Sequence, residues 1–483
     1  MDKDKYIGQS QEKDKIIRQL LEKVNELTFR LEQAEKRIAV LEAENTTLKS
    51  ENAELKARLN QNSKNSSKPP SSEGYQKKPA LPRSKKGRQG GQKGHRGRTL
   101  QQVAHPDHII ACRPDPCKCG HGFTNDELIL AERRQVFDLP KPRLEVKEYQ
   151  IQKATCPHCG IVSRGTAPEG VCAPVQYGNG VKAYMVLLGT HFTVPFKKVQ
   201  LLFSDLFGYP INESTAWSAG QLCYDKLALT EEIIKDKIAA SPIGHADETG
   251  IRVEGGLHWL HTATTLRHTY LFAHKKRGRL ALRSEKSLLP RFTGWLVHDC
   301  WSSYFKFHGF KHAICGAHIL RELEGLIENH QSKWAKTLKT FLLHLYHMPF
   351  EERVKRRDQL CGRFDHICSI GKQHEPAPVK TKGKRGRDKR TKGRNLVERI
   401  IREKKAVLAF AFNSHVPFTN NLAERDIRPI KVKQKVSNCF RTLQGADIYA
   451  RVQGFISTAR KNNRNVFLEL SHTFEGHNFI TSE

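Results

Sequence analysis

Ile-Gly-His-Ala-Asp-Glu-Thr-Gly (243–250) is the stretch that decides the fold of this chain. It opens with small and apolar residues, and Asp247 stands where that run ends, which is typical of the tip of a buried β-strand. A second stretch, Gly-Trp-Leu-Val-His-Asp-Cys-Trp (294–301), places Asp299 in the same setting. We therefore expect two strands that each carry an aspartate at the end.

The segments around these stretches alternate in the pattern of an α/β sheet. A hairpin is predicted for 251–262, where Gly255 and Gly256 form the turn. Further strands are predicted at 268–273 and 312–315, and the periodicity after them predicts a helix. A strand, a hairpin, a strand and then a parallel strand with the second aspartate is the order of a ribonuclease-H-like core.

A third carboxylate, Glu424, lies far along the chain in Thr-Asn-Asn-Leu-Ala-Glu-Arg-Asp-Ile-Arg-Pro (419–429). It falls in the first turns of a helix that Thr419 or Asn420 would open. Carboxylates collected at strand tips can hold two divalent metal ions against a phosphodiester, and oxygen ligands suit Mg²⁺ or, alternatively, Mn²⁺. We therefore predict that Asp247, Asp299 and Glu424 are catalytic and bind metal.

The order of these residues divides the core into two parts. The first part is predicted at 241–319, and the second, which carries Glu424, at 413–470. Between them we expect a helical insertion at 320–412. Within it, the segment 380–394 holds nine basic residues and one acid and is predicted to be a loop that clamps DNA, the alternative being a solvated loop.

The bulk composition points to a polyanionic partner. The chain has 483 residues and a formal net charge of +32, so several domains and attraction to DNA or RNA are expected, with an anionic membrane as the weaker alternative. No apolar run approaches the roughly 20 residues that span a bilayer, and no secretory signal is evident. Twelve cysteines favour a reducing compartment. We expect a cytoplasmic protein associated with the nucleoid, with no membrane partner.

Residues 14–60 carry a heptad repeat. One position is filled mostly by branched residues and the other mostly by leucine, which favours a parallel two-stranded coiled coil. The first position holds Ile17, Val24, Leu31, Ile38, Asn45, Asn52 and Leu59, and the second holds Leu20, Leu27, Ala34, Leu41, Leu48 and Leu55. We predict a homodimer through this helix; the alternative is a long helix packed within its own chain.

Residues 61–104 form a predicted flexible basic linker. Between residues 61 and 100 there are eleven lysines or arginines and one acid, Glu73, and the apolar content is too low to order the segment. Such a segment could lie along phosphates, or it could be only a solvated linker.

Residues 105–175 hold a candidate zinc ribbon. Cys117-Lys-Cys119-Gly is followed by Cys156-Pro-His-Cys159-Gly, and a strand-like segment at 144–151 lies between them. Two such knuckles suit a tetrahedral structural Zn²⁺ site with four cysteine ligands. The first gap is one residue shorter than usual, so another side chain could replace one ligand, and buried free thiols are the alternative. The possible replacements are Cys112, His121 and His158.

Residues 176–240 are predicted to be helical. Segments 181–189 and 198–207 are apolar with helical spacing, and 211–218 has turn and N-cap residues before another helix. This arrangement favours equally a helix-turn-helix that reads DNA and a scaffold for the core that follows.

Together these motifs resemble the insertion-sequence-66 family of transposases. The matching stretches are the leading heptads, Ser-Lys-Pro-Pro-Ser-Ser (67–72), Gly-Gly-Gln-Lys-Gly-His-Arg-Gly (90–97), the zinc knuckles, the stretches around the three acids, and Cys-Gly-Ala-His-Ile-Leu-Arg-Glu-Leu (315–323). The resemblance implies an Asp-Asp-Glu enzyme that cleaves the ends of a mobile element and joins them to target DNA. The shorter first knuckle departs from the family's commoner spacing.

Basic residues after Glu424 are candidates for DNA contact. Arg428 is four residues on and could instead pair with Glu424 on one helix face, which would be a structural role. The candidate DNA-binding residues are Arg425, Arg428, Lys433, Lys435 and Arg441. Cys315 and His318 resemble a Cys-x-x-His element of several transposase groups and are expected to form hydrogen bonds near the active site or simply to pack.

Two rival functions remain. One is a ribonuclease-H-like nuclease without strand transfer, which would not need a coiled coil to pair two DNA ends. The other is a zinc-containing DNA-binding regulator with an inactive core, against which the complete set of three acids argues. The expected partners are double-stranded DNA, a second copy of the chain and possible helper proteins.

Overall fold

The computed structural model describes residues 3–62, 64–66, 100–378 and 390–482. Most of the basic linker at 61–104 and most of the basic loop at 380–394 fall outside these residues. The chain forms two compact units. The first comprises 1–75, 241–246 and 291–421, and the second comprises 76–240, 247–290 and 422–483.

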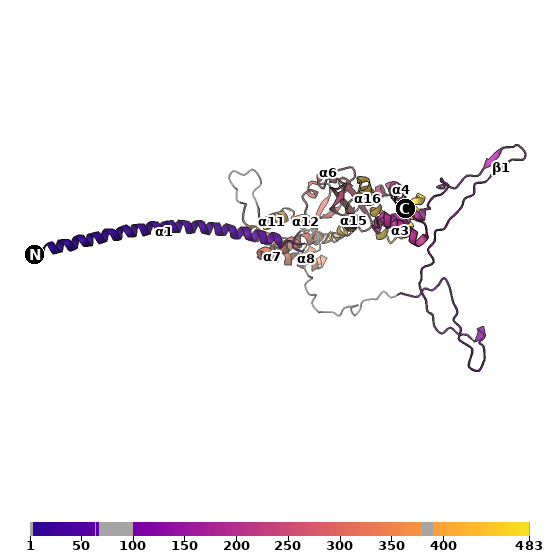
Figure 1. Cartoon of the computed structure of the whole chain (residues 1–483), viewed down its shortest axis with the longest axis horizontal. Helices are drawn as coiled ribbons and strands as arrows, with labels where there is room; N and C mark the ends of the chain where they lie inside the picture. The colour runs from indigo at the N-terminus through magenta and orange to yellow at the C-terminus, as the bar shows by residue number, and fades with distance from the viewer. Residues whose placement is uncertain (1–2, 63, 67–99, 379–389, 483) are drawn as a thin grey trace. The chain divides into compact units, whose positions relative to one another are not determined.

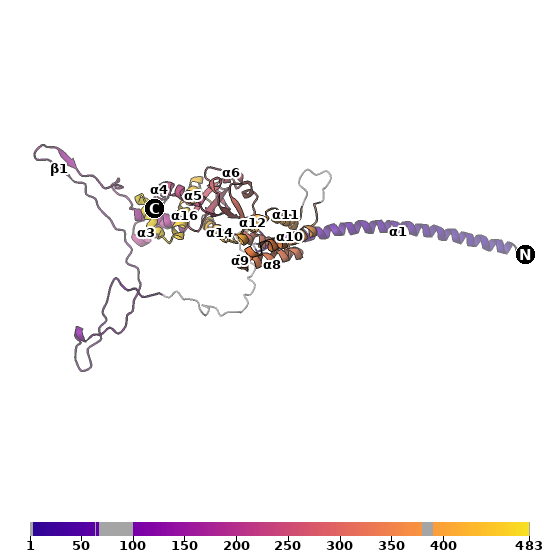
Figure 2. The ribbon, with the colours of Figure 1, turned by 180° about the vertical axis from the view of Figure 1, so that it is seen from behind.

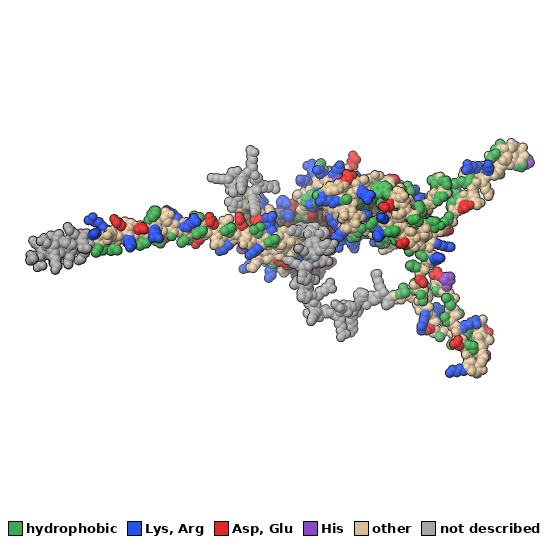
Figure 3. Space-filling view, viewed as in Figure 1, with side chains coloured by type: hydrophobic (Ala, Val, Ile, Leu, Met, Phe, Trp, Pro, Cys, Tyr) green, Lys and Arg blue, Asp and Glu red, His purple; other side chains and the backbone are tan. Residues whose placement is uncertain are grey.

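One long helix, α1 (Lys3–Leu59), opens the first unit (Figure 1). Its heptad residues are exposed; Ile17, Leu27, Ile38 and Leu41, for example, have about half of their surface open to solvent, from 49% to 57%. Figure 3 shows hydrophobic, basic and acidic side chains interleaved along the helix. No described residue of the first unit covers these side chains, and both the coiled coil and the helix packed within its own chain stay predictions.

The segment after α1 is fastened to α7 (Gly316–His330) within the first unit. Asn60 Nδ2 donates to Asn329 Oδ1 at 3.0 Å, and Asn65 Nδ2 donates to Glu328 Oε2 at 2.6 Å. The Asn65 backbone oxygen lies so close to Gly325 that a Cβ there would sit 2.3 Å from it. We name these contacts the asparagine clasp.

Three parallel strands lie in the first unit. They are the start of β3 (Ile243–Val253), β6 (Trp295–His298) and β7 (Lys311–Ile314). β6 pairs in parallel with β3, with His245 opposite Val297, and with β7. These strands confirm the predicted positions within a few residues.

Helices follow β7 and cover the insertion predicted at 320–412. They share one buried core that includes Leu323, Leu338, Phe364 and Val397, and Figure 2 shows them grouped together. After α7 they are α8 (Lys333–His347), α9 (Phe350–Lys355), α10 (Arg357–His374), α11 (Lys392–Arg402), α12 (Lys404–Val407) and α13 (Ala409–Phe412). Short 3₁₀ turns also occur at η4 (Leu289–Arg291) and η5 (Tyr304–Lys306).

The second unit contains the rest of β3 with β4 (Gly256–Thr264) and β5 (Thr269–His274). The turn between β3 and β4 has positive φ angles at Glu254 and Gly255, as a tight hairpin requires. The predicted strand tip at 243–247 and the first half of the hairpin are thus one strand. The strand order is β5-β4-β3-β6-β7, so the core is a mixed sheet in a ribonuclease-H-like α/β fold.

Helices of the second unit pack on this antiparallel part and on one another. α16 (Leu443–Lys461) and α5 (Ala228–Ala239) lie on β5, and α17 (Val466–Glu475) lies on α2 (Asn179–Val186). The others are η3 (Leu187–His191), α3 (Phe196–Phe207), α4 (Glu213–Lys226), α6 (Arg279–Leu282), α14 (Asn421–Ile427) and α15 (Pro429–Ser437). The Asn212 side chain caps α4 by accepting from the Ser214 amide at 3.1 Å, as the N-cap pattern predicts.

Residues 100–178 have little regular structure. A 3₁₀ turn, η2 (Asn125–Glu127), precedes a hairpin of β1 (Lys153–Thr155) and β2 (Val162–Arg164), which pair with Thr155 opposite Val162. The strand predicted at 144–151 is absent there, and the hairpin lies just beyond it instead. No helix among the described residues is long and apolar enough to cross a membrane.

Candidate active site

The two aspartates differ in their place on the strands, because Asp247 lies within β3 whereas Asp299 directly follows β6. The last registered pair of β3 and β6 is His245 with Val297, so Asp247 and Asp299 each stand two residues beyond it. The prediction that Asp247 ends a strand is therefore wrong: the parallel pairing with β6 stops at His245, but β3 continues to Val253 as part of the hairpin.

Glu248, the neighbour of Asp247, has a structural partner. Its side chain is 1% exposed and accepts from Arg277 Nε at 2.9 Å and Nη2 at 2.7 Å. Arg277 also lies over the ring of Trp259, 4.8 Å from the centroid. Successive strand residues point to opposite faces, so this pairing leaves Asp247 as the candidate ligand, as the sequence predicts.

Asp299 begins the loop after β6, and its Oδ1 accepts from the Trp301 amide at 2.9 Å. The preceding residue, His298, is fully buried and lies against the Asp299 backbone carbonyl. Its Nε2 is 3.0 Å from His312 Nδ1. Burial lowers the pKa of His298 to about 3, so this ring is neutral and holds the turn in place.

Asn420 connects the start of α14 to β3. It is 1% exposed, its Nδ2 donates to the Ala246 carbonyl at 2.8 Å, and its Oδ1 lies 3.0 Å from His245 Nδ1. Its backbone amide contacts Cys315 Sγ at 3.2 Å. A single buried asparagine therefore holds the chain that enters α14 against the residue before Asp247.

Cys315 is buried at the start of α7, and His318 follows it by less than one turn. The contact of the Cys315 sulfur with the Asn420 amide is of the hydrogen-bonding kind expected for this element. Gly316 is required here because a Cβ would sit 2.2 Å from the Phe418 ring, and the Gly316 amide donates to the Phe418 carbonyl at 2.8 Å.

Glu424 lies in the first turn of α14, and Pro429 starts α15 after α14 has ended. Glu424 Oε1 is buried, and no group among the described residues forms a hydrogen bond with it. Oε2 is 3.8 Å from Arg428 Nη2, the predicted pairing four residues on. Buried carboxylate oxygens are normally satisfied, so an unsatisfied one fits a site that takes a cation.

The basic residues after Glu424 differ in exposure. Arg425, Arg428, Lys435 and Arg441 are exposed. Lys433, in contrast, is half-buried and its Nζ donates to the Gly189 carbonyl at 3.4 Å.

Lys431, which also follows Glu424, lies close to Asp247. Its Nζ donates to the Gly250 carbonyl at 3.0 Å. Burial lowers the pKa of Lys431, and the charge of Asp247 partly opposes this shift. A cation therefore stands near the first aspartate.

The two cysteine pairs form matching turns. The Gly120 amide donates to the Cys117 carbonyl at 2.8 Å, and the Gly160 amide donates to the Cys156 carbonyl at 2.9 Å. Both glycines have the positive φ that the turn demands, 91° and 73°. The first knuckle is one residue tighter, as the sequence indicates.

The surroundings of these thiols favour metal binding. Hydrogen bonds from the His121 backbone and the Cys117 side chain lower the pKa of Cys119, and those from the Cys159 and His158 backbones lower the pKa of Cys156. Thiolates are the form that binds zinc. Neither pair belongs to a cluster of three or more potential ligands in the described chain, so the structure does not bring the four cysteines together and the four-cysteine site stays a prediction.

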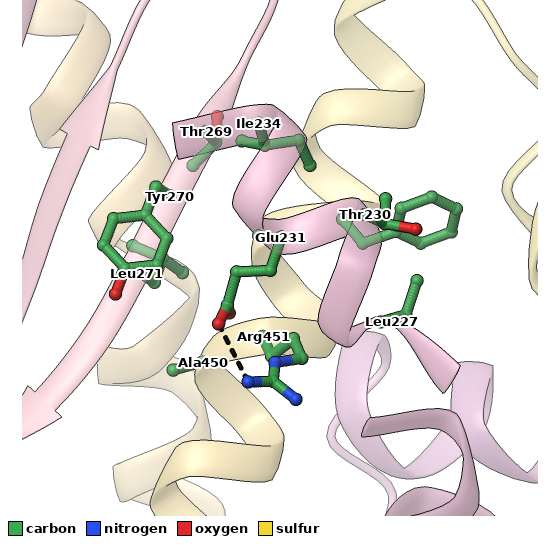
Figure 4. Close-up of a pocket in the computed structure, with 11 residues that line it drawn as sticks. Leu227, Thr230, Glu231, Ile234, Thr269, Tyr270, Leu271, Ala450 and Arg451 are labelled. Atoms are coloured by element: carbon green, nitrogen blue, oxygen red, sulfur yellow. Dashed lines mark ion pairs between the residues drawn. The ribbon is translucent and has the colours of Figure 1, made fainter. Parts of the chain in front are cut away.

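A small cavity in the second unit surrounds a half-buried ion pair and not a substrate site (Figure 4). Glu231 of α5 and Arg451 of α16 meet at 3.0 Å, and the guanidinium lies over the Tyr224 ring, 3.7 Å from its centroid. The free volume is about 10 Å³, which holds one water molecule at most.

Comparison with known families agrees with these features. Residues 174–448 match the transposase IS66 family, and residues 114–160, which include both cysteine pairs, match the zinc-finger binding domain of transposase IS66. Residues 5–101 match a family of unknown function. No curated protein matches the chain. Because the first of these matches covers more than half of the sequence, the chain belongs to the IS66 family of transposases, with a zinc-finger domain and a DDE catalytic domain.

Proposed function

We propose that this transposase binds the two ends of a mobile DNA element, cleaves them by metal-dependent hydrolysis and joins the freed 3'-hydroxyls to target DNA. In this proposal Asp247, Asp299 and Glu424 hold Mg²⁺ or Mn²⁺ and carry the chemistry. When bound, the ions would supply positive charge that activates water or a 3'-hydroxyl and stabilises the departing oxygen.

Asn420 is the observation that supports this proposal most. It ties the chain four residues before Glu424 to the Ala246 carbonyl, next to Asp247. The parallel register of β3 and β6 supports the remaining pair of acids. The unsatisfied Oε1 of Glu424 suits a metal ligand, because a buried carboxylate oxygen otherwise loses the hydrogen bonds it makes in water.

The protein's own residues also position the DNA. Arg425, Arg428, Lys435 and Arg441 are exposed and follow Glu424 in the chain, where they can neutralise backbone phosphates. Lys433 is a weaker candidate because it already donates inside the protein. Pairing of two α1 helices would give the homodimer that brings two element ends together, with helper proteins as possible further partners.

Zinc would have a separate, structural role. Four thiolates from Cys117, Cys119, Cys156 and Cys159 would complete a tetrahedral site and leave no position for a reacting water. The bound Zn²⁺ would therefore order the hairpin region and would not take part in cleavage.

A strand-transfer assay with pre-nicked element ends tests the function. The wild-type protein with Mg²⁺ should join these ends to target DNA, whereas Asp299→Asn and Glu424→Gln should lower joining by at least about 1000-fold, since each removes an anionic ligand. Glu248→Gln is the matched control because its carboxylate is committed to Arg277. Unchanged joining by Asp299→Asn would overturn the catalytic assignment, and cleavage without joining would favour the nuclease.

A further inference from the structure

Asp426 lies two residues after Glu424 in α14, and its side chain is 6% exposed. Its Oδ2 accepts from Lys461 Nζ at 2.6 Å and from Thr264 Oγ1 at 2.7 Å. Thr269 Oγ1 lies 3.2 Å from the same oxygen, and Ser457 Oγ donates to Oδ1 at 3.2 Å. We call these five residues the Asp426 network.

The partners in this network come from rigid elements. Thr264 ends β4, Thr269 begins β5, and both Ser457 and Lys461 belong to α16. Lys461 Nζ also donates to the Thr265 carbonyl at 2.9 Å. A buried charge is tolerated only when it is paired and hydrogen-bonded, and the network meets this condition at every carboxylate oxygen of Asp426.

The network has a consequence for α14 because this helix is short. Seven residues cannot form a stable helix alone, so its place and rotation depend on tertiary contacts. Each residue turns a helix by about 100°, and residues two apart therefore point to roughly opposite sides. Fixing Asp426 toward α16 and the β4–β5 strands directs Glu424 to the other side of the helix.

We propose that Asp426 is a positioning residue: through Lys461 and three hydroxyl groups it sets the rotation of α14 and so aims Glu424 as a metal ligand. This inference rests on the proposed catalytic role of Glu424. Asp426 would touch neither DNA nor metal. Its effect would appear in how tightly the active site holds its ions.

The test measures DNA cleavage by the full chain as a function of Mg²⁺ concentration. For Asp426→Asn the half-saturating Mg²⁺ concentration should rise by about tenfold or more, the usual effect of losing a residue that orients a ligand. Binding to an element-end duplex without divalent ions should stay unchanged, because the exposed arginines are intact.

Glu231→Gln is the matched control. It breaks another ion pair of α16, with Arg451 at 3.0 Å, but not a contact of α14. It should lower the melting temperature and leave the Mg²⁺ requirement unchanged. The double variant Asp426→Asn/Lys461→Met removes both buried charges, so it should melt at a higher temperature than Asp426→Asn while keeping the raised Mg²⁺ requirement.

The outcomes separate this inference from the proposed function. An Mg²⁺ requirement that is unchanged in Asp426→Asn, or that returns to the wild-type value in the double variant, would mean that the network only stabilises the fold and would overturn the inference. Full cleavage by Glu424→Gln would instead overturn the catalytic assignment itself.

Discussion

His261 in β4 illustrates how burial fixes the charge state of single residues in this protein. Its ring is 2% exposed and stacks on Phe272, with 4.8 Å between centroids. Burial lowers the pKa of His261 to about 4, helped by the nearby charges of His274 and Arg277, although a hydrogen bond to the Lys276 carbonyl opposes the shift. The folded protein therefore keeps this ring neutral under mildly acidic conditions.

We expect this histidine to make stability fall as the pH decreases. Between about pH 6.5 and pH 4, His261 binds a proton in the unfolded chain but not in the folded chain. As the pH decreases through this range, His261 therefore lowers the free energy of unfolding by up to about 1.4 kcal/mol per pH unit. Above pH 6.5 it has no such effect. Urea titrations at several pH values should show a shallower pH dependence for His261→Phe than for the control, His258→Phe. Equal slopes would contradict the prediction.

Single residues also mark the limit of sequence-based inference. Asp247 and Asp299 could be proposed as catalytic residues because each ends an apolar run in the sequence, and Glu424 because it lies in the first turn of a predicted helix. Asp426 gave no such signal, since its partner Lys461 belongs to another helix and only the fold joins them. Lys433 has a basic side chain like its neighbours, and its inward hydrogen bond depends on the packing of α15.

At the level of elements, local turns outweigh strand propensity. The alternating residues at 144–151 read as a strand but pair with no other described segment. The tight turn from Cys156 to Gly160, in contrast, brings its two flanks together as β1 and β2. The strands of the core were predictable because burial on both faces leaves continuous apolar runs. The sequence could not predict that the strand at 243–247 and the first half of the hairpin form one long β3, because this depends on pairing with distant strands.

The cysteine turns make a prediction about metal content. Purified protein should hold one Zn²⁺ per chain, and Cys119→Ser should lower this to nearly zero, because the site would lose one of its four thiolates. Cys172→Ser is the control: this exposed cysteine lies outside both turns. Elemental analysis after dialysis measures the content. Retained zinc in Cys119→Ser together with zinc loss in His121→Ala would identify the histidine as the ligand.

At the scale of the whole molecule, the proposed homodimer would form through the exposed heptad residues of α1. We expect Leu27→Glu/Leu41→Glu to be monomeric, because the charges fall on the heptad seam. The control, Phe29→Glu/Val40→Glu, changes equally exposed apolar residues off the seam and should stay dimeric. Sedimentation equilibrium measures the mass. The monomeric variant should bind one element end but fail to pair two ends. If Leu27→Glu/Leu41→Glu remained dimeric, the coiled-coil assignment would be wrong.

The asparagine clasp couples the angular phase of α1 to α7. One residue added between Lys49 and Ala57 would turn the heptad seam by about 100° relative to the clasp, while a full heptad would turn it by only about 20°. Natural length variation in this stretch should therefore come in multiples of seven. The clasp thus fixes the rotation of α1 about its own axis. In a dimer, this rotation, more than the length of the helix, would set how each copy is oriented relative to the coiled coil.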